Sequence, residues 1–410
     1  MDYYTFRKFT IKAHSHEVVI VGKPGVWSWD GLDPGTAALL EVAEIEPDDS
    51  VLDLGCGTGV IGAAASALVP RGRVTLVDCN AAATACAERT LATNAVANAE
   101  VQLADGVERL VPASFDLVLS HLPRGRAVQE ELIRGAAWVL QPGGRFYLVA
   151  NKRAGIKGAI SYTRALFGQC GVVRQKKGYH VALAVKPTQP SAACSTAVAA
   201  PPIDSYITRT VILNGVETAL VSKPGVFAWD RVDAGTAALV GAMEIDVRDR
   251  VLDLGCGTGL AGLAAARRAS EGQVVLVDAD ARAVESARRT LEANTIANGE
   301  TLLSDCGSAV LDRQFGHGRF DAGRFDAGRF DRLITNPPFH QGVGVNYEVA
   351  RQFVRDAVRV LRRGGRLFLV ANRFLRYSDL IRETFGNVAT AYADNHYHVL
   401  TAVAQKSSSG

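Results

Sequence analysis

Four consecutive residues, Asn336-Pro337-Pro338-Phe339, combine groups that can bind and orient a planar amine. They follow the apolar run 333–335, which predicts a short buried strand. The asparagine offers an amide carbonyl, the prolines stiffen the backbone, and the phenylalanine offers a ring for stacking. Because ligands of open α/β sheets bind at the carboxyl ends of strands, this tetrapeptide is a candidate active site.

These groups suit the activation of an exocyclic amine on a base. Such an amine is a poor nucleophile because its lone pair is delocalised into the ring. The side chain of Asn336 and the backbone carbonyl of Pro337 could both accept from the amine and turn its lone pair outward, in a preorganised geometry. A base extruded from its stack would present this amine. A simple turn that ends a strand is the alternative for an isolated Asn-Pro-Pro sequence.

A glycine-rich turn precedes the tetrapeptide and contains Asp253, Gly255, Gly257 and Gly259. It joins a predicted strand to a predicted helix, where glycine lets the backbone approach a ligand closely. This turn differs from the usual dinucleotide and P-loop motifs, because its spacing is G-x-G-x-G, an acid precedes it and it has no Walker lysine. An NAD-dependent dehydrogenase remains an alternative.

Two further aspartates follow the next predicted strands. Asp278 ends the second strand, where its carboxylate could accept from both hydroxyls of a ribose, and Asp305 follows the third, where it could accept from an adenine amino group. Each aspartate alone could equally be a helix cap or a turn former. The three acids at this spacing together predict a cofactor site.

The sequence contains two copies of one unit. The segment 51–59 recurs at 251–259, and the matching continues to Asp105 and Asp305. Beyond that point the second copy carries a tract of Gly-Arg-Phe-Asp-Ala repeats around 318–331, which we predict to be an expanded surface loop. We predict domains at 1–186 and 205–405, joined by a linker at 187–204 that is rich in proline and alanine.

Strands alternate with helices in each copy, which predicts an α/β fold with two tandem Rossmann-like domains, each a mostly parallel, doubly wound sheet. In the second copy we expect strands at 250–253, 274–277, 333–335, 366–371, 387–391 and 397–404, and helices at 259–268, 281–294 and 348–363.

The glycine turn with its three acids resembles the class I S-adenosylmethionine-dependent methyltransferases. The resemblance implies S-adenosylmethionine as the cofactor, with Asp253 near its aminoacyl end. Around the tetrapeptide, the segments 335–340, 370–377 and 385–386 resemble the bacterial RsmC/RlmG ribosomal-RNA guanine-N2 methyltransferases, as does 224–236, which looks like that family's cofactor-capping segment. This second resemblance implies methylation of a guanine 2-amino group in ribosomal RNA or a ribosomal subunit by the second of two tandem domains.

The first copy lacks the candidate catalytic residues. It has Ser120-His121-Leu122-Pro123-Arg124 in place of the tetrapeptide, and the sequence suggests no partner for the histidine. The following loop is also shorter and lacks a counterpart of 341–347, a predicted lid. The residues 53–59, Asp78 and Asp105 survive, so cofactor binding there stays open. We expect a noncatalytic domain.

Basic residues are concentrated in two segments. Residues 132–186 contain ten lysines and arginines and no acid, and 351–382 contain nine arginines against two aspartates. Such blocks favour a polyanionic partner, and we expect the first copy to hold RNA phosphates. The alternative is a solvated face whose acids come from elsewhere in the fold.

The remaining features exclude several classes of protein. The chain has 48% hydrophobic residues, no apolar run long enough to span a membrane and no signal sequence at the start. We therefore expect a cytoplasmic protein. We also expect a monomer. Seven cysteines without a C-x-x-C pair predict neither a disulfide framework nor a metal site.

Three alternatives for the activity stay open at this stage. The same tetrapeptide pattern serves methylation of adenine-N6 in DNA and of a glutamine amide in release factors. A noncatalytic RNA-binding ribosome assembly factor is the alternative from another class.

Overall fold

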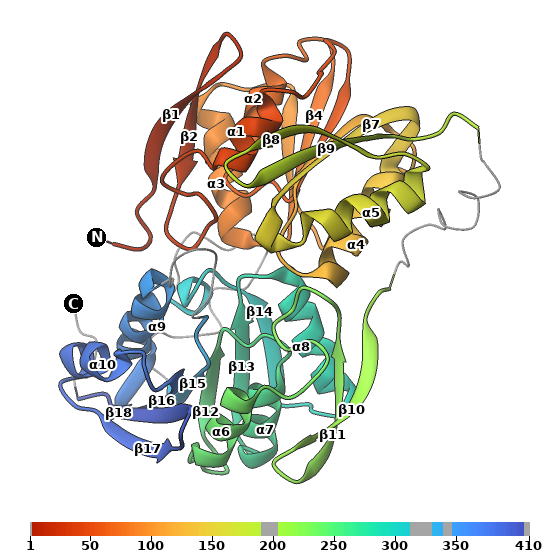
Figure 1. Cartoon of the computed structure of the whole chain (residues 1–410). Coiled ribbons are helices and arrows are strands. Elements are labelled where there is room, and N and C mark those ends of the chain that lie inside the picture. The colour runs from red at the N-terminus through yellow and green to blue at the C-terminus, as the bar shows by residue number, and fades with distance from the viewer. Residues whose placement is uncertain (1, 190–203, 312–329, 339–346, 406–410) are drawn as a thin grey trace. The chain divides into compact units, whose positions relative to one another are not determined.

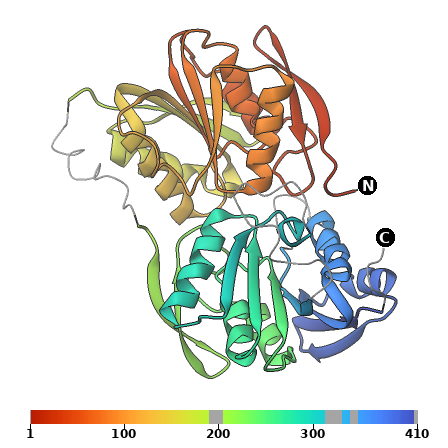
Figure 2. The ribbon, with the colours of Figure 1, turned by 180° about the vertical axis from the view of Figure 1, so that it is seen from behind.

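The computed structural model describes residues 2–189, 204–311, 330–338 and 347–405. The chain divides into two compact units, Met1–Ser205 and Tyr206–Gly410 (Figures 1 and 2). Within the described residues, each unit holds one seven-stranded sheet and one separate two-stranded hairpin. Phe339, most of the predicted lid and linker, and most of the Gly-Arg-Phe-Asp-Ala tract lie outside the described residues.

The first unit alternates strands and helices after its hairpin. Its elements are β1 (Arg7–Ala13), β2 (His16–Gly22), α1 (Pro34–Leu40), β3 (Ser50–Leu54), α2 (Val60–Ser66), β4 (Arg73–Asp78), α3 (Ala81–Thr93), β5 (Ala99–Leu103), β6 (Phe115–His121), α4 (Arg126–Val139), β7 (Leu140–Asn151), η1 (Lys152–Ala154), α5 (Ile156–Phe167), β8 (Gly171–Lys176) and β9 (Tyr179–Val185).

The second unit repeats this order. Its elements are β10 (Ile207–Leu213), β11 (Val216–Ser222), α6 (Ala234–Ala242), β12 (Arg250–Leu254), α7 (Leu260–Arg268), β13 (Gln273–Asp278), α8 (Ala281–Ala293), β14 (Gly299–Leu303), η2 (Ser308–Val310), β15 (Phe330–Thr335), α9 (Tyr347–Val360), β16 (Leu361–Asn372), α10 (Tyr377–Phe385), β17 (Ala389–Ala393) and β18 (Tyr397–Val403).

The two large sheets share one topology. The strand orders are β5-β4-β3-β6-β7-β9-β8 and β14-β13-β12-β15-β16-β18-β17. All neighbours pair in parallel except β9 and β18, which run antiparallel to the strands on both sides. The predicted fold, two tandem Rossmann-like domains with mostly parallel sheets, is therefore confirmed. In each sheet the strand order reverses beside β3 or β12, the first strand of that sheet in sequence. Ligands of open α/β sheets bind at this point, outside the carboxyl ends of the strands.

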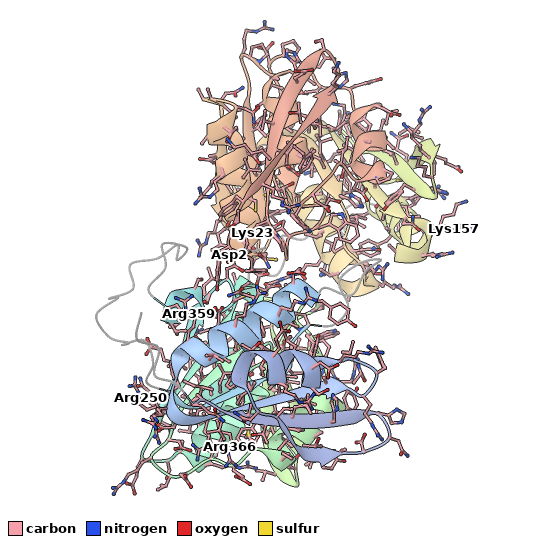
Figure 3. All side chains as sticks on the ribbon, turned by 90° about the vertical axis from the view of Figure 1, so that its left-hand side faces the viewer. Asp2, Lys23, Lys157, Arg250, Arg359 and Arg366 are labelled. Carbon is pink, nitrogen blue, oxygen red and sulfur yellow. The ribbon has the colours of Figure 1, made fainter. Side chains whose placement is uncertain are left out.

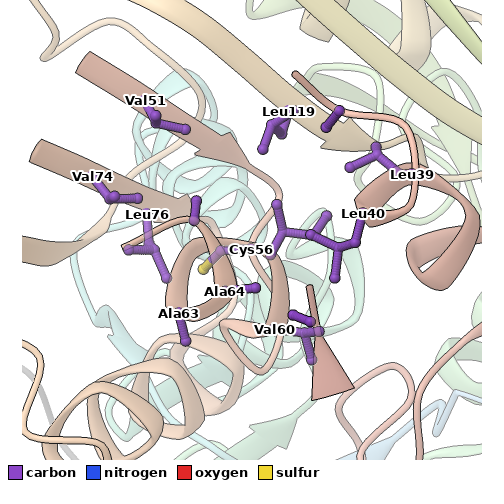
Figure 4. Packing of buried hydrophobic residues seen from close by; sticks show 14 of the residues in the cluster. Leu39, Leu40, Val51, Cys56, Val60, Ala63, Ala64, Val74, Leu76 and Leu119 are labelled. Carbon is purple, nitrogen blue, oxygen red and sulfur yellow. The ribbon is translucent and has the colours of Figure 1, made fainter. Parts of the chain in front are cut away.

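The core of the first unit lies on both faces of its sheet because strand residues point alternately to either side. Val51 of β3 belongs to the cluster under α1, α2 and α3, whereas the adjacent Leu52 belongs to the cluster under α4 and α5. Figure 4 shows part of the first cluster, to which the strand residues Val74, Leu76 and Leu119 and the helix residues Ala63 and Ala64 belong. Burying each large aliphatic side chain stabilises the fold by about 1.5–3 kcal/mol. The helices on both faces therefore stabilise the sheet through these buried contacts.

Helix α8 carries the hairpin β10–β11, which the sequence interpretation missed. The amide of Asn294 accepts from Ala219 N (3.1 Å) and donates to Ala219 O (2.7 Å), and Thr290 Oγ1 accepts from Val221 N (3.1 Å). Side chains in the last turn and at the C-cap of α8 thereby form hydrogen bonds with backbone groups of β11. The first unit repeats these bonds between α3 and β2.

Other boundaries differ from the predictions by a few residues. Helix α9 ends at Val360 and β16 begins immediately at Leu361, where the sequence interpretation extended the helix to 363. Helix α10 was not predicted. No helix in the described part of the chain is long and apolar enough to cross a membrane.

Candidate active site

The glycine turn of the second unit folds back over β13. The backbone N–H groups of Gly255 and Cys256 both donate to Val277 O, at 2.8 and 3.0 Å. Gly255, Gly257 and Gly259 all have positive φ, at 76°, 53° and 79°, a conformation that favours glycine. A Cβ at Gly259 would also lie 2.8 Å from the Cα of Ala287 in α8. The turn therefore needs glycine for its conformation and for the close packing of α7 against α8.

Asp253 lies buried in β12 and forms a hydrogen bond with the helix that follows the glycine turn. Its Oδ2 accepts from Gly262 N at 2.8 Å, which satisfies one of the unpaired amides in the first turn of α7. Burial raises the pKa of this carboxyl to about 7. The structure thus gives Asp253 a clear role in shaping the loop, while its contact with the aminoacyl end of a cofactor stays a prediction.

Asp278 ends β13 and holds the other side of the turn. Its Oδ2 accepts from Gly257 N at 2.9 Å and its Oδ1 accepts from Asp280 N at 3.0 Å. Burial raises the pKa of the Asp278 carboxyl to about 6. Each carboxylate oxygen can accept more than one bond, so both remain able to accept from ribose hydroxyls.

Asp305 completes a row of three acids along the sheet. It lies buried in the turn after β14, where its backbone oxygen accepts from Ser308 N at 3.2 Å. The sheet order β14-β13-β12 places the three acids at the carboxyl ends of adjacent strands. A Cβ at Gly257 would meet nothing within 4 Å, so this face of the turn is open. Carboxylates around an open glycine turn suit a ligand that carries amine and hydroxyl donors, as S-adenosylmethionine does.

Asn336 follows β15 directly, and both hydrogens of its amide are engaged. Nδ2 donates to Asp233 Oδ2 at 3.1 Å and to Thr236 Oγ1 at 3.2 Å. Asp233 is itself fixed, because its Oδ2 accepts from Thr236 N at 3.0 Å and caps α6. Since the amide is planar, these bonds also fix the direction of the carbonyl oxygen Oδ1. The side chain is therefore held as an oriented acceptor.

Pro337 ends the strand and releases Asn336 from the sheet. In the first unit, the counterpart Leu122 donates its N–H to Val149 O at 2.9 Å, and β6 runs on to His121. Proline has no N–H to make this bond, and β15 ends one position earlier, at Thr335. Pro337 is buried and Pro338 is half-buried. The stacking role of Phe339 stays a prediction because that residue lies outside the described chain.

His121 occupies the place of Asn336 in the first unit and keeps the same neighbours. Its Nδ1 lies 3.1 Å from Thr36 Oγ1 and 3.5 Å from Asp33 Oδ1, and its ring meets that of Tyr179 edge-on. The expectation that His121 has no partner was therefore wrong. Burial lowers the pKa of this imidazole, so the neutral form is favoured at neutral pH. The support survives in this copy, but the amide acceptor does not.

The sequence interpretation missed the roles of Asp233 and Thr236, which it assigned only to a cofactor-capping segment. The internal repeat could have found them, because Asp33-x-Gly35-Thr36 recurs as Asp233-x-Gly235-Thr236. The intervening glycine is needed as well: a Cβ at Gly235 would lie 3.2 Å from the ring of Tyr397 and 3.5 Å from Asn336 Nδ2. A larger residue would push against the candidate catalytic amide.

Two exposed aromatic rings lie in segments that border the carboxyl edge of the same sheet. Phe227, in the turn before α6, is 55% exposed, and Phe374, just after β16, is 68% exposed. The first unit has Trp27 in place of Phe227, and the Trp27 ring centroid lies 6.3 Å from that of His121. By the repeat, Phe227 holds the position in the second unit that Trp27 holds in the first, and its exposed ring is open to contact by a planar group.

The basic segment of the first unit is partly neutralised by acids from elsewhere in the fold. Arg174 and Lys176 both pair with Glu41, and Arg145 pairs with Asp49. The segment is therefore less basic than its sequence suggests. The arginines of the second unit show the same pattern, with ion pairs from Arg362 to Asp331, Arg366 to Glu244 and Arg382 to Asp379.

Three exposed cations lie together at the carboxyl end of β7: Lys152, Arg153 and Lys157. Figure 3 shows Lys157 projecting from its unit. Burial lowers the pKa of His180, and the charges of Lys152 and Lys157 lower it further. We call Lys152, Arg153 and Lys157 the β7 basic cluster. Among the described residues, no group of three or more His, Cys, Asp or Glu side chains could hold a metal ion.

Comparison with known proteins places this geometry in a family. The model of the methyltransferase small domain matches residues 17–183, 217–317 and 320–401. Ribosomal RNA small subunit methyltransferase C of Pseudomonas putida (strain W619) is 33% identical over 292 residues, covering 71% of this chain and 80% of the relative. The protein of the same name from Psychromonas ingrahamii is 29% identical over 70% of this chain and 76% of its own length.

A solved structure matches the chain almost end to end. It is the T. thermophilus 16S rRNA N2 G1207 methyltransferase (RsmC) in complex with AdoMet and guanosine. The TM-score is 0.78 at 30% identity, and the match covers 97% of this chain and 98% of the other. Both units, and not one alone, are therefore similar to that protein.

Proposed function

Because the chain belongs to the methyltransferase small domain family, we propose that its second unit methylates the exocyclic 2-amino group of a guanine in small-subunit ribosomal RNA. The names of the relatives and of the T. thermophilus structure support this substrate. The observation that carries the proposal is the amide of Asn336, whose nitrogen is held by Asp233 and Thr236 so that the direction of its carbonyl oxygen is fixed.

The cofactor in this proposal is S-adenosylmethionine, held by the glycine turn and the three acids. Asp278 would accept from the ribose hydroxyls, Asp305 from the adenine amino group, and Asp253 would favour the ammonium end of the amino acid. When bound, S-adenosylmethionine supplies a methyl group on a positively charged sulfur. The open face at Gly257 is where the backbone comes closest to such a ligand.

The tetrapeptide activates the acceptor amine by hydrogen bonding. Asn336 Oδ1 and the backbone carbonyl of Pro337 accept the two N–H bonds of the guanine amine, which turns its lone pair out of the ring plane. Preorganised acceptors of this kind require no reorganisation during the reaction. As the methyl–sulfur bond breaks, with its electron pair left on the sulfur, the new C–N bond would form, and both carbonyls would stabilise the positive charge on the amine. An amide is too weak a base to keep the proton, which therefore passes to solvent.

We further propose that the domains divide this work, with 1–186 noncatalytic, 187–204 a linker and 205–405 catalytic. The first domain lacks the oriented amide and carries the β7 basic cluster, which suits RNA phosphates. Since one chain supplies both functions, the protein needs no second copy and would act as a monomer. A ribosomal RNA substrate places it in the cytoplasm.

Transfer of labelled methyl groups to isolated substrates tests this function. The purified chain is incubated with labelled S-adenosylmethionine and, separately, with small ribosomal subunits, large subunits, double-stranded DNA and a peptide release factor. We expect N2-methylguanosine in small-subunit RNA only. Label on an adenine or a glutamine would replace the proposal by that activity. Cofactor binding without transfer to any of the four would indicate a noncatalytic assembly factor.

A further inference from the structure

The first unit contains a second glycine turn whose backbone matches that of the catalytic unit. Gly55, Gly57 and Gly59 have φ of 82°, 55° and 78°, against 76°, 53° and 79° at the positions 200 residues later. The N–H groups of Gly55 and Cys56 donate to Val77 O at 2.9 and 3.0 Å, as their counterparts do to Val277 O. The loss of the catalytic tetrapeptide has therefore left the shape of this turn unchanged.

The acids that shape the turn also keep their geometry. Asp78 Oδ2 accepts from Gly57 N at 2.9 Å, the same distance as between Asp278 and Gly257. Asp53 Oδ2 accepts from Gly62 N at 2.8 Å, again as in the second unit. The first unit therefore keeps both the conformation of the turn and the carboxylate at the end of β4, the position that Asp278 holds in the second unit.

One oxygen of Asp53 has no partner. Asp53 is fully buried, and within the described residues its Oδ1 makes no hydrogen bond. An unsatisfied buried carboxylate oxygen is costly, and most buried polar atoms in proteins are paired. Burial raises the pKa of this carboxyl to about 7. A ligand whose ammonium or hydroxyl reached Oδ1 would supply the missing partner.

The turn of the first unit is also more open than that of the second. A Cβ at Gly55 or at Gly57 would meet nothing within 4 Å. In the second unit the ring of Phe353, from α9, lies 2.9 Å from a Cβ built on Gly255. The equivalent position of α4 holds the smaller Leu132. The open space and the carboxylates that could accept from a ligand therefore lie at the same turn.

We propose that the first unit binds an adenosyl amino acid of its own, S-adenosylmethionine or its demethylated product, at the turn 53–59. No methyl transfer follows there, because His121 replaces the amide acceptor. The ligand is recognised by the carboxylates of Asp53 and Asp78 and by the open face of the glycine turn. This binding does not depend on which RNA the second unit methylates, so the two proposals fail separately.

Binding stoichiometry on the full chain tests this proposal. In equilibrium dialysis with labelled S-adenosylmethionine and no RNA, we expect two molecules per chain at saturation. Asp78→Asn keeps an acceptor for Gly57 N–H but loses the charge, so we expect its site to weaken at least tenfold. At the lowest free concentration that saturates both native sites, the bound number should therefore fall towards one. The matched variant Asp278→Asn should also leave one, and the double variant none.

A stoichiometry of one that Asp278→Asn abolishes and Asp78→Asn leaves unchanged would overturn the proposal. Photochemical crosslinking of the labelled cofactor to the wild-type chain gives a second measurement, which is independent of how the variants fold. We expect label in peptides that span 51–80 as well as in those that span 251–280. Label confined to the second set would contradict the site in the first unit.

Discussion

The substitution Asp233→Ala tests how the catalytic amide is oriented. In the native chain, both hydrogens of Asn336 Nδ2 are engaged by Asp233 Oδ2 and Thr236 Oγ1. Alanine removes the first of these acceptors, so one N–H of the amide loses its partner and the direction of the carbonyl oxygen Oδ1 is no longer fixed. Asp233→Asn is the matched control. A single oxygen, Asp233 Oδ2, accepts from both Thr236 N and Asn336 Nδ2, and the oxygen of an asparagine can replace it in both bonds.

The size of the effect follows from the hydrogen bond that is lost. Leaving a partly buried donor unsatisfied costs about 1–3 kcal/mol, and other orientations of the amide become accessible by about that amount. Because each 1.4 kcal/mol is a factor of ten, we expect kcat of Asp233→Ala to fall about tenfold to a hundredfold. Loss of the cap of α6 should lower the free energy of unfolding by about 0.5–2 kcal/mol. The affinity for S-adenosylmethionine should stay close to that of the native chain.

The control Asp233→Asn should keep near-native activity. Single-turnover methyl transfer to small subunits measures both variants, and cofactor titration checks that binding is intact. A near-native kcat for Asp233→Ala would refute the orientation argument. So would a loss in Asp233→Asn as large as that in Asp233→Ala.

Three further predictions address the cofactor, the strand end and RNA binding. Burial raises the pKa of Asp278 to about 6, and the ligand's hydroxyls need the ionised carboxylate. The affinity for S-adenosylmethionine should therefore fall about tenfold from pH 7 to pH 5. Calorimetry that shows no change in affinity would contradict this. Pro337→Ala restores an N–H that can bond to β16, so β15 should lengthen and kcat should fall at least tenfold without loss of Tm; an unchanged kcat would argue against the role of the proline. The double variant Lys152→Ala/Lys157→Ala should weaken RNA binding and lower the slope of log affinity against log salt by about 0.7–0.9 for each phosphate that it no longer neutralises. The control Lys12→Ala, on the hairpin β1–β2, should change neither quantity. Equal effects in the variant and the control would show that the β7 basic cluster does not bind RNA.

Local patterns in the sequence predicted the parts of the fold that depend on neighbouring residues. The glycine turn could be placed because the strand, the turn and the helix follow one another within 250–268. The hairpin β10–β11 carried an equally local signal that was overlooked: Asn214-Gly215 joins its strands with φ of 48° and 82°, which is the usual conformation of a two-residue hairpin turn.

Interactions between distant residues escaped prediction for a physical reason. Asn336 lies 103 residues from Asp233 in sequence and 100 from Thr236, and nothing local to either segment indicates that they meet. The basic segment shows the same limitation, because Glu41 pairs with Lys176 over 135 residues. Periodicity indicates where elements form, but only the packed sheet shows which side chains orient the reacting amide.

Mass spectrometry of ribosomal RNA tests the central claim most directly. The samples come from a strain that lacks this gene and from the same strain carrying either the native chain or Asn336→Ala. We predict that one N2-methylguanosine in small-subunit RNA disappears with the gene and returns with the native chain. Asn336→Ala should not restore it, although that variant binds S-adenosylmethionine as the native chain does. An unchanged modification in the deletion strain, or its full return with Asn336→Ala, would contradict the account.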